Sequence, residues 1–199
     1  MLEIYQNPPT LENERIKLIP MEMDHVQPLF AMSDSGVWEF MLTEVKTEKQ
    51  MHHWVEKAVE LRREGTALPF VVILKETNQL VGTTRLFNID FNQKACEIGS
   101  TWYGPRFRRT FVNSDCKFLL LQFCFEEMRF IRVQLKTDER NIRSQKAIER
   151  MGAVKEGVLR NERILDNGYI RNAVLYSITK EEWPTVKEGF IRRNALYES

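Results

Sequence analysis

The sequence has few residues of the kinds that mark specialised protein classes. Its three cysteines, Cys96, Cys116 and Cys124, are odd in number and form no Cys-x-x-Cys pair, so neither a disulfide framework nor a cysteine zinc site is expected. Nine glycines and seven prolines among 199 residues are too few for a collagen-like or low-complexity chain. No apolar run reaches the length of a membrane span, and the first residues lack the apolar region of a signal peptide. We therefore expect a reduced, cytoplasmic protein with buried thiols and no membrane partner.

Motifs for several kinds of chemistry are also absent. His52 and His53 are adjacent and fall on different faces of a helix, while His25 stands alone, so no metal site is expected. In the sequence GSTWYG, Ser100 directly follows Gly99, and the Gly-x-Ser-x-Gly spacing of a serine nucleophile is not met. The chain also has no Walker or dinucleotide fingerprint, which argues against nucleoside-triphosphate and hydride chemistry.

Net charge is low but unevenly distributed. The whole chain carries +1, which gives no argument for general attraction to nucleic acid or an anionic membrane. Residues 105–150, however, contain eleven lysines and arginines against six acidic residues. One hypothesis is an RNA- or ribosome-associated protein that contacts phosphate through this segment. The segment lacks interleaved exposed aromatic residues, which argues against nucleic acid as the partner.

What the chain does contain fits one ordinary globular domain. Apolar residues make up 43% and charged residues 29%, and the length allows a full hydrophobic core. We expect a single domain over residues 1–199, with a core of 11–179 and a partly helical C-terminal appendage of 180–199. Trp183, Phe190 and Leu196 of the appendage could pack on a partner, which leaves a homodimer open.

Hydrophobic periodicity predicts the order of the elements. Strands are predicted over 15–21, 69–76, 80–90, 95–104, 131–138, 153–165 and 169–179, and helices over 22–34, 47–64, 112–128 and 141–151, with an irregular segment at 33–46. The strand, helix, strand order over 95–138 implies one parallel, right-handed crossover in an otherwise antiparallel sheet. We predict an α+β fold with a mixed, mostly antiparallel twisted sheet of about six to seven strands, a central parallel pair and about four flanking helices.

A basic stretch, GPRFRRTFVN, occupies residues 104–113 at the start of the helix predicted at 112–128. A helix start offers unpaired backbone N–H groups and the positive end of a dipole, so Arg108 and Arg109 complete a site for an anionic ligand. The helix carries a wide apolar face that includes Phe118 and Phe125, and we expect it to be buried on more than one side.

Several stretches, in one order, resemble the GNAT family of N-acetyltransferases, in particular its RimJ/RimL-like branch, which includes ribosomal-protein N-terminal acetyltransferases. They are EIG in a strand, the basic loop, RVQLKTD, NIRSQKAIERMGA and EGVLRNERILDNGYIRNAVLYSI, and the resemblance covers about residues 11–179. The strongest local motif is Asn141-x-x-Ser144 followed by Met151-Gly152-Ala153. The resemblance implies transfer of acetyl from acetyl-CoA to a primary amine in a ternary complex, without a covalent enzyme intermediate. A small molecule or a protein N-terminus would fit as the acceptor.

The family rests the pyrophosphate of acetyl-CoA on a loop patterned Gln/Arg-x-x-Gly-x-Gly/Ala. The residues that align with this loop are Arg108, Arg109, Thr110, Phe111, Val112 and Asn113. Phe111 stands where the family has Gly, and Asn113 where it has Gly or Ala, although glycine lets the backbone approach phosphate closely and adopt φ > 0. In one interpretation the ring of Phe111 packs into the core and the arginines offset the poorer backbone contact. In the other, the site is damaged and the protein is a catalytically impaired binding module.

Acetyl transfer needs a deprotonated amine, a polarised carbonyl and a proton for the departing thiolate. By resemblance, Ser144 donates to the thiolate, because the Tyr that many GNATs place four residues before the helix-ending Gly is here Ile148. Ser144 could instead bond only its own first turn, and Asn141 could cap the helix with or without binding pantetheine or a catalytic water. Glu97 could take the proton of the amine through water, hold a cationic substrate, or be an exposed strand carboxylate paired with a basic neighbour.

Two further sets of residues complete the expected site. By resemblance, the thioester carbonyl and pantetheine would bind backbone N–H groups of Thr101, Trp102 and Tyr103. The acceptor pocket would be lined by three aromatic side chains, Trp38, Phe40 and Tyr169. For all of these side chains, packing in the core is the alternative.

Overall fold

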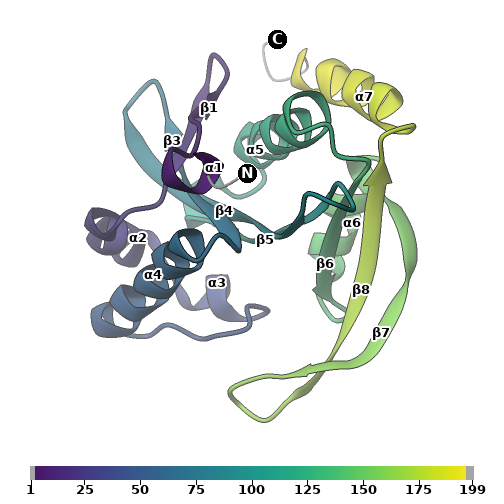
Figure 1. Cartoon of the computed structure of the whole chain (residues 1–199). Helices are drawn as coiled ribbons and strands as arrows, with labels where there is room; N and C mark the ends of the chain where they lie inside the picture. The colour runs from purple at the N-terminus through teal and green to yellow at the C-terminus, as the bar shows by residue number, and fades with distance from the viewer. Residues whose placement is uncertain (1–2, 196–199) are drawn as a thin grey trace.

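The computed structural model describes residues 3–195, which fold around one twisted sheet with helices on both faces (Figure 1). Within this range the sheet has eight strands in the order β1-β2-β3-β4-β5-β6-β8-β7. They are β1 (Leu11–Glu12), β2 (Ile16–Pro20), β3 (Ala67–Leu74), β4 (Gln79–Asp90), β5 (Ala95–Tyr103), β6 (Arg132–Asp138), β7 (Val154–Ile164) and β8 (Ile170–Thr179). Among these eight strands of the described residues, only β5 and β6 pair in parallel. The predicted α+β class with a central parallel pair is confirmed, and the strand missing from the prediction is the two-residue β1.

The helical elements match the four main helices that periodicity predicts, and add several short ones and a helix of 13 residues in the appendage expected to be partly helical. They are α1 (Glu3–Gln6), η1 (Met23–His25), α2 (Val26–Met32), α3 (Ser35–Trp38), α4 (Glu48–Arg63), η2 (Pro105–Phe107), α5 (Phe111–Gln122), the π-helix η3 (Phe123–Glu127), α6 (Ile142–Arg150) and α7 (Trp183–Ala195). The segment expected to be irregular contains α3, whose N-cap Asp34 accepts a hydrogen bond of 3.1 Å from the Val37 N–H. No helix of the described residues is long and apolar enough to cross a membrane.

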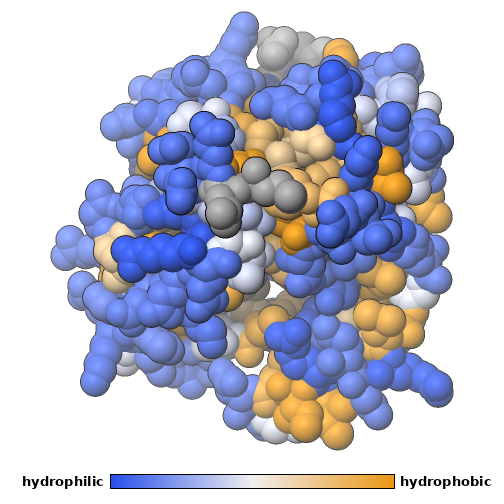
Figure 2. Space-filling model, viewed as in Figure 1, coloured by the Kyte–Doolittle hydropathy of each residue, from blue (hydrophilic) through white to orange (hydrophobic). Residues whose placement is uncertain are grey.

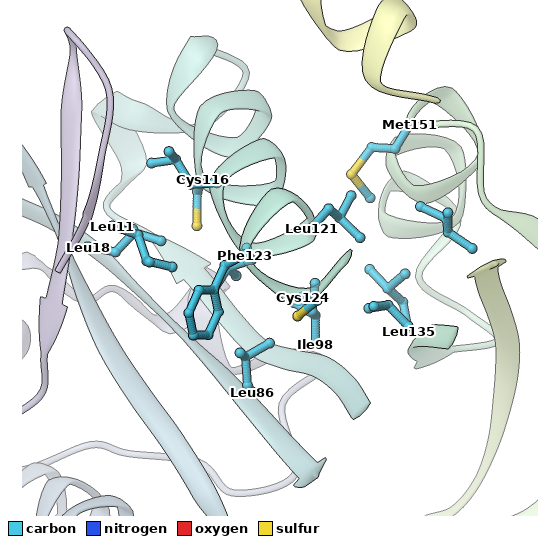
Figure 3. Close-up of a cluster of buried hydrophobic side chains, with 14 of the residues drawn as sticks. Leu11, Leu18, Leu86, Ile98, Cys116, Leu121, Phe123, Cys124, Leu135 and Met151 are labelled. Atoms are coloured by element: carbon cyan, nitrogen blue, oxygen red, sulfur yellow. The ribbon is translucent and has the colours of Figure 1, made fainter. Parts of the chain in front are cut away.

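The two faces of the sheet carry different helices. Side chains alternate along β3, so that Phe70 and Val72 belong to the core beneath α5, whereas Val71 and Ile73 belong to the core beneath α4. Figure 1 shows α3 and α4 on one side of β4 and β5, and α5 on the other. Within the core on the α5 side, Leu121 lies over the central strands, as Figure 3 shows.

The C-terminal helix covers the outer side of α5, which confirms that α5 is buried on more than one side. The Trp183 ring stacks on Phe125 with centroids 5.4 Å apart, and the Phe190 ring lies 5.7 Å from that of Phe118. Trp183 and Phe190 are thus buried inside this chain, so the expectation that they pack on a partner is wrong; Leu196 lies outside the described residues. Exposed apolar side chains instead gather near the tip of the β7–β8 hairpin, at Ile164, Tyr169 and Ile170 (Figure 2).

The feature that positions the site is the divergence of β5 and β6. Their parallel register runs only from Ala95, opposite Arg132, to Ile98, opposite Leu135. Beyond that point β5 continues along β4, while β6 continues along β8. Ser100 lies in this part of β5 with φ of 47°, where the β4–β5 register also shifts. The second half of β5 therefore has backbone groups that β6 does not pair.

Candidate active site

A cavity of about 1820 Å³ opens where β5 and β6 separate. It brings together most of the residues predicted for the site: Phe40, Glu97, Thr101, Trp102, Tyr103, Arg108, Arg109, Thr110, Asn113, Asn141 and Ser144. Four predicted residues do not line it: Trp38, Phe111, Val112 and Tyr169. The lining residues come from both faces of the sheet, so the cavity joins the α5 side to the α4 side through the gap.

On the α5 side, the cavity meets the first turn of α5. Thr110 caps this helix, because its hydroxyl accepts a hydrogen bond of 3.3 Å from the Val112 N–H and donates one of 2.8 Å to the Phe107 carbonyl. The remaining N–H groups of a first helical turn have no partner within the helix, and Asn113 places part of this turn on the cavity wall. The turn is a suitable anion site even though it lacks glycine.

The two adjacent arginines have different surroundings. Arg108 forms an ion pair with Asp34, the cap of α3, and its Nε donates a hydrogen bond of 3.2 Å to the Tyr103 carbonyl. Its charge is therefore compensated, and it ties α3 to the end of β5. Arg109 is exposed, lines the cavity and adopts φ of 64°. Of the two, Arg109 is the cation better placed to meet an anion.

Phe111 begins α5 with its ring directed toward the core. The half-buried ring packs against the α5-side core, and the Arg15 guanidinium lies 4.6 Å from its centroid. Arg15 in turn donates hydrogen bonds of 2.6 and 2.8 Å to the buried carboxylate of Asp115. The left-handed conformation of this loop is at Arg109, so position 111 does not need glycine for φ > 0. This geometry fits the interpretation in which the loop keeps its shape.

The start of α6 forms another part of the cavity wall. The Asn141 side chain accepts a hydrogen bond of 3.0 Å from the Ser144 N–H, so its predicted capping role is confirmed. Both side chains are half-buried and line the cavity, where the hydroxyl of Ser144 can meet a ligand.

Lys117 is a cavity residue that sequence reasoning missed. It is only 5% exposed, and its Nζ donates a hydrogen bond of 2.6 Å to Thr101 Oγ1, which also lies 2.8 Å from Thr84 Oγ1. Burial lowers the pKa of Lys117 to about 8. The sequence did contain one signal for this residue, because Lys117 is the single charged residue between Cys116 and Leu121 in an apolar part of the helix.

On the α4 side, Glu97 is the central carboxylate. The expectation of an exposed carboxylate is wrong, since Glu97 is 2% exposed, while the expected basic partner is Lys136, whose Nζ lies 3.3 Å away. Gln134 Nε2 and Asn88 Nδ2 also donate hydrogen bonds to Oε2 of Glu97, at 2.8 and 3.1 Å. These donors hold the carboxylate in the cavity wall.

A line of charged residues extends from Glu97 toward the β7–β8 hairpin. Lys136 lies 3.3 Å from Glu162, which lies 3.3 Å from Arg171. Asp138, in the same line, accepts two side-chain hydrogen bonds from Arg140, at 2.8 and 2.9 Å. Burial acts to raise the pKa of Asp138, but the hydrogen bonds from Arg140 hold it below its usual value.

Arg140 connects two of the predicted aromatic residues. Its guanidinium lies 3.7 Å from the ring centroid of Tyr169 and 5.7 Å from that of Phe40, so it bridges the hairpin and the segment after α3. Trp38 belongs elsewhere: it is buried against Trp102 and Trp54, with ring centroids 5.4 and 5.9 Å away. Phe40 thus lies on the cavity wall, whereas Trp38 packs against Trp54 and Trp102, which themselves line the cavity.

Comparisons with known proteins agree with this architecture. The family described as Acetyltransferase (GNAT) domain matches residues 15–154. The chain is 27% identical over 176 residues to the uncharacterised N-acetyltransferase p20 of Bacillus licheniformis, covering 87% of this chain and 98% of that protein. It is 31% identical over 105 residues to a protein of Bacillus subtilis (strain 168) named "Putative ribosomal N-acetyltransferase YdaF", covering 52% of this chain and 56% of that one.

Solved structures show the same relationship across the whole fold. A crystal structure of a "putative acetyltransferase" from T. thermophilus superposes with a TM-score of 0.86 at 32% identity, covering 94% of this chain and 97% of that chain. The matched family spans the diverging strands, the start of α5 and the start of α6, which together form the cavity. The chain therefore belongs to the GNAT family and is an acyl-CoA-dependent acetyltransferase.

Proposed function

We propose that this protein transfers an acetyl group from acetyl-CoA to a primary amine by direct attack in a ternary complex. The observation that carries the proposal is the single cavity that reaches both faces of the sheet through the gap between β5 and β6. Two substrates that enter from opposite faces meet at that gap, so the amine can reach the thioester without a covalent intermediate on the enzyme.

The α5 side has the groups needed for acetyl-CoA. Backbone N–H groups of the first turn of α5, with Arg109 beside them, would hold the pyrophosphate. The second half of β5, residues 99–103, is free of β6 and would pair with the amides of pantetheine. Ser144 would donate a proton to the departing thiolate, with Asn141 fixing the helix that carries it.

The α4 side would hold the amine. Glu97 lies in the cavity wall with its orientation fixed by Gln134 and Asn88. It would accept the proton of the amine through a water molecule, or hold the amine in its cationic form before transfer. Phe40 lines the same cavity and would contact the acceptor.

We also propose that the chain belongs to the RimJ/RimL-like branch. The Asn141-x-x-Ser144 motif lies on the cavity, and the partial similarity to YdaF supports this assignment. A protein N-terminus or a small amine would both fit this proposal.

Calorimetric titration with acetyl-CoA, followed by measurement of free thiol released in the presence of amines, tests the function. We expect micromolar binding and acceptor-dependent release of CoA. Absence of binding at millimolar acetyl-CoA would refute the proposal and leave the catalytically impaired binding module, in which Phe111 and Asn113 have disabled the loop.

A further inference from the structure

Arg85 is a buried cation on the α4 side of the cavity. Its neighbour on β4, Leu86, belongs to the α5-side core, and alternation therefore directs Arg85 toward α4. There its guanidinium carbon lies 4.1 Å from the ring centroid of Trp54. The residue is 9% exposed and lines the cavity.

Within the described part of the chain, the guanidinium of Arg85 has no carboxylate and no hydrogen-bond acceptor. Its Nε and Nη2 are buried without a partner. Burial lowers the pKa of Arg85 to about 10, which reflects the cost of keeping this charge out of water. Trp54 stabilises the flat face of the guanidinium but accepts no hydrogen bond from the Nε and Nη2 groups. A buried charge with unpaired donors is strongly unfavourable unless a ligand completes it.

The arrangement of neighbouring strands explains why Glu97 does not pair with Arg85. In the β4–β5 register, Arg85 is opposite Gly99 and Phe87 is opposite Glu97. These four residues are the corners of a square on the sheet, in which Phe87 is diagonal to Gly99 and Arg85 is diagonal to Glu97. A Cβ atom on Gly99 would lie 2.8 Å from Cε1 of Phe87, so the Phe87 ring lies over Gly99 along the first diagonal. The other diagonal joins Arg85 to Glu97, and the ring crosses it. Arg85 and Glu97 are thus kept apart on one face of the sheet, beside the same cavity.

We propose that Arg85 binds an anionic group, a carboxylate or a phosphate, on the amine acceptor. This inference rests on the proposed function, because it concerns the acceptor of the same reaction. We do not assign this anion to the phosphates of acetyl-CoA, because their proposed site is at the start of α5, on the opposite face of the sheet. A guanidinium favours planar, bidentate binding of a carboxylate or phosphate, and the two unpaired donors supply it.

The positions of Arg85 and Glu97 fit a small acceptor. Diagonal positions on neighbouring antiparallel strands are about 7–8 Å apart. Both side chains start from such a pair of positions and line one cavity, so a small acceptor can place its amine near Glu97 and its anion at Arg85. Amino acids, small phosphorylated amines and peptides whose first residue is acidic have this chemistry.

Acceptor pairs that differ only in the anion test the proposal. Suitable pairs are β-alanine with β-alaninamide, phosphoethanolamine with ethanolamine, and a tetrapeptide that begins with Asp with one that begins with Asn. We expect kcat/KM at least about tenfold higher for the acidic member of at least one pair, because recognition of one charged group is commonly worth that much. The pair that responds identifies the source of the anion.

Variants of Arg85 assign the effect to this residue. Arg85→Gln should raise KM for the acidic acceptor by about tenfold or more, with little change for its neutral partner or in kcat. Arg85→Lys keeps the charge without the bidentate geometry, and its KM for the acidic acceptor should lie between those of the parent protein and Arg85→Gln. Arg63→Gln, an exposed arginine of α4 outside the cavity, is the matched control and should change nothing. Melting curves and acetyl-CoA titration of each variant show that the fold and the cofactor site are intact.

The outcomes separate this inference from the proposed function. Failure of the unaltered protein to bind acetyl-CoA would overturn both. Acetylation of neutral and acidic acceptors at equal efficiency would overturn the role of Arg85 and leave the acetyltransferase standing. The role of Arg85 is also overturned if Arg85→Gln or Arg85→Lys weakens both members of a pair equally, since a residue that only packs against Trp54 would act in this way.

Discussion

Replacing Lys117 with methionine should stabilise the folded protein at neutral pH. Lys117 is almost fully buried, and its Nζ donates to the neutral hydroxyl of Thr101. The carboxylate of Asp115, two positions earlier on the same helix, is engaged by Arg15 and Asn194. Burial lowers the pKa of Lys117 from 10.5 to about 8, so at pH 7 the folded state holds an ammonium ion in an unfavourable environment.

The size and sign of the effect follow from the difference between the two pKa values. Between pH 8 and 10.5 the unfolded chain binds a proton that the folded protein does not, so the contribution of Lys117 to stability rises with pH in this window. Below pH 8 the full penalty is present, and it corresponds to about 3 kcal/mol. Methionine fills similar volume without a charge, and Lys117→Met should gain most of that free energy at pH 7.

Urea denaturation at several values between pH 7 and pH 9 measures this prediction. The advantage of Lys117→Met over the parent protein should shrink by about 1 kcal/mol across this range, as Lys117 loses its proton in the folded state. Burial also raises the pKa of the nearby thiol of Cys116. Lys57→Met, an exposed lysine of α4, is the control and should give no pH-dependent difference. A difference that is constant with pH, or a less stable Lys117→Met at pH 7, would refute the reasoning.

Three further changes test other parts of the structure. Phe111→Gly should destabilise the protein by about 2–3 kcal/mol because a half-buried ring and helix propensity are lost; its affinity for acetyl-CoA, measured by thermal shift, should not increase, and tighter binding would show that the ring obstructs the loop. Ser144→Ala should lower kcat by at least about 100-fold with an unchanged dissociation constant for acetyl-CoA, whereas an unchanged kcat would exclude Ser144 as the proton donor. Hydrogen bonds from Arg132 lower the pKa of Glu156 to about 2, so the contribution of Glu156 to stability is present above pH 4.5 and is lost as pH falls toward 2. In Glu156→Gln, the free energy of unfolding should therefore fall less steeply with pH between 4.5 and 2. An acid denaturation curve identical to that of the parent protein would contradict this.

Sequence patterns predicted the long elements because their apolar residues repeat at clear periods. The helix at 112–128 and the strand at 131–138 follow the observed α5, η3 and β6 closely. The helix α3 was missed because four residues show no periodicity, although Asp34 was available as a capping signal. Trp38 was expected in the pocket, but the packing of three tryptophans against each other comes from distant segments that periodicity does not relate.

The charged residues of the site were harder to predict than its backbone. Alternation along β4 assigns Arg85 to the face opposite Leu86, and a charged residue on such a face is normally exposed. It is buried here because Trp54 covers it from α4, some thirty positions earlier in the chain. Glu97 is buried for a similar reason, since its donors come from β4 and β6. Contacts of this kind depend on which elements meet, and the local sequence does not contain that information.

The positions of Arg85 and Lys117, two of the buried cations, also explain what the separation of β6 from β5 provides. Arg85 faces α4 opposite Gly99, whereas Lys117 comes from α5 and bonds Thr101, so the two charges approach β5 from opposite faces within three consecutive residues. In a fully paired sheet this stretch would be enclosed on both faces, and each cation would reduce stability without contacting a ligand. Because β6 leaves β5 just before Gly99, both cations reach one cavity. In the proposed function, the destabilisation expected from each charge is thus concentrated where acetyl-CoA and the amine acceptor would meet, and fixed charges at that point would act on the group being transferred.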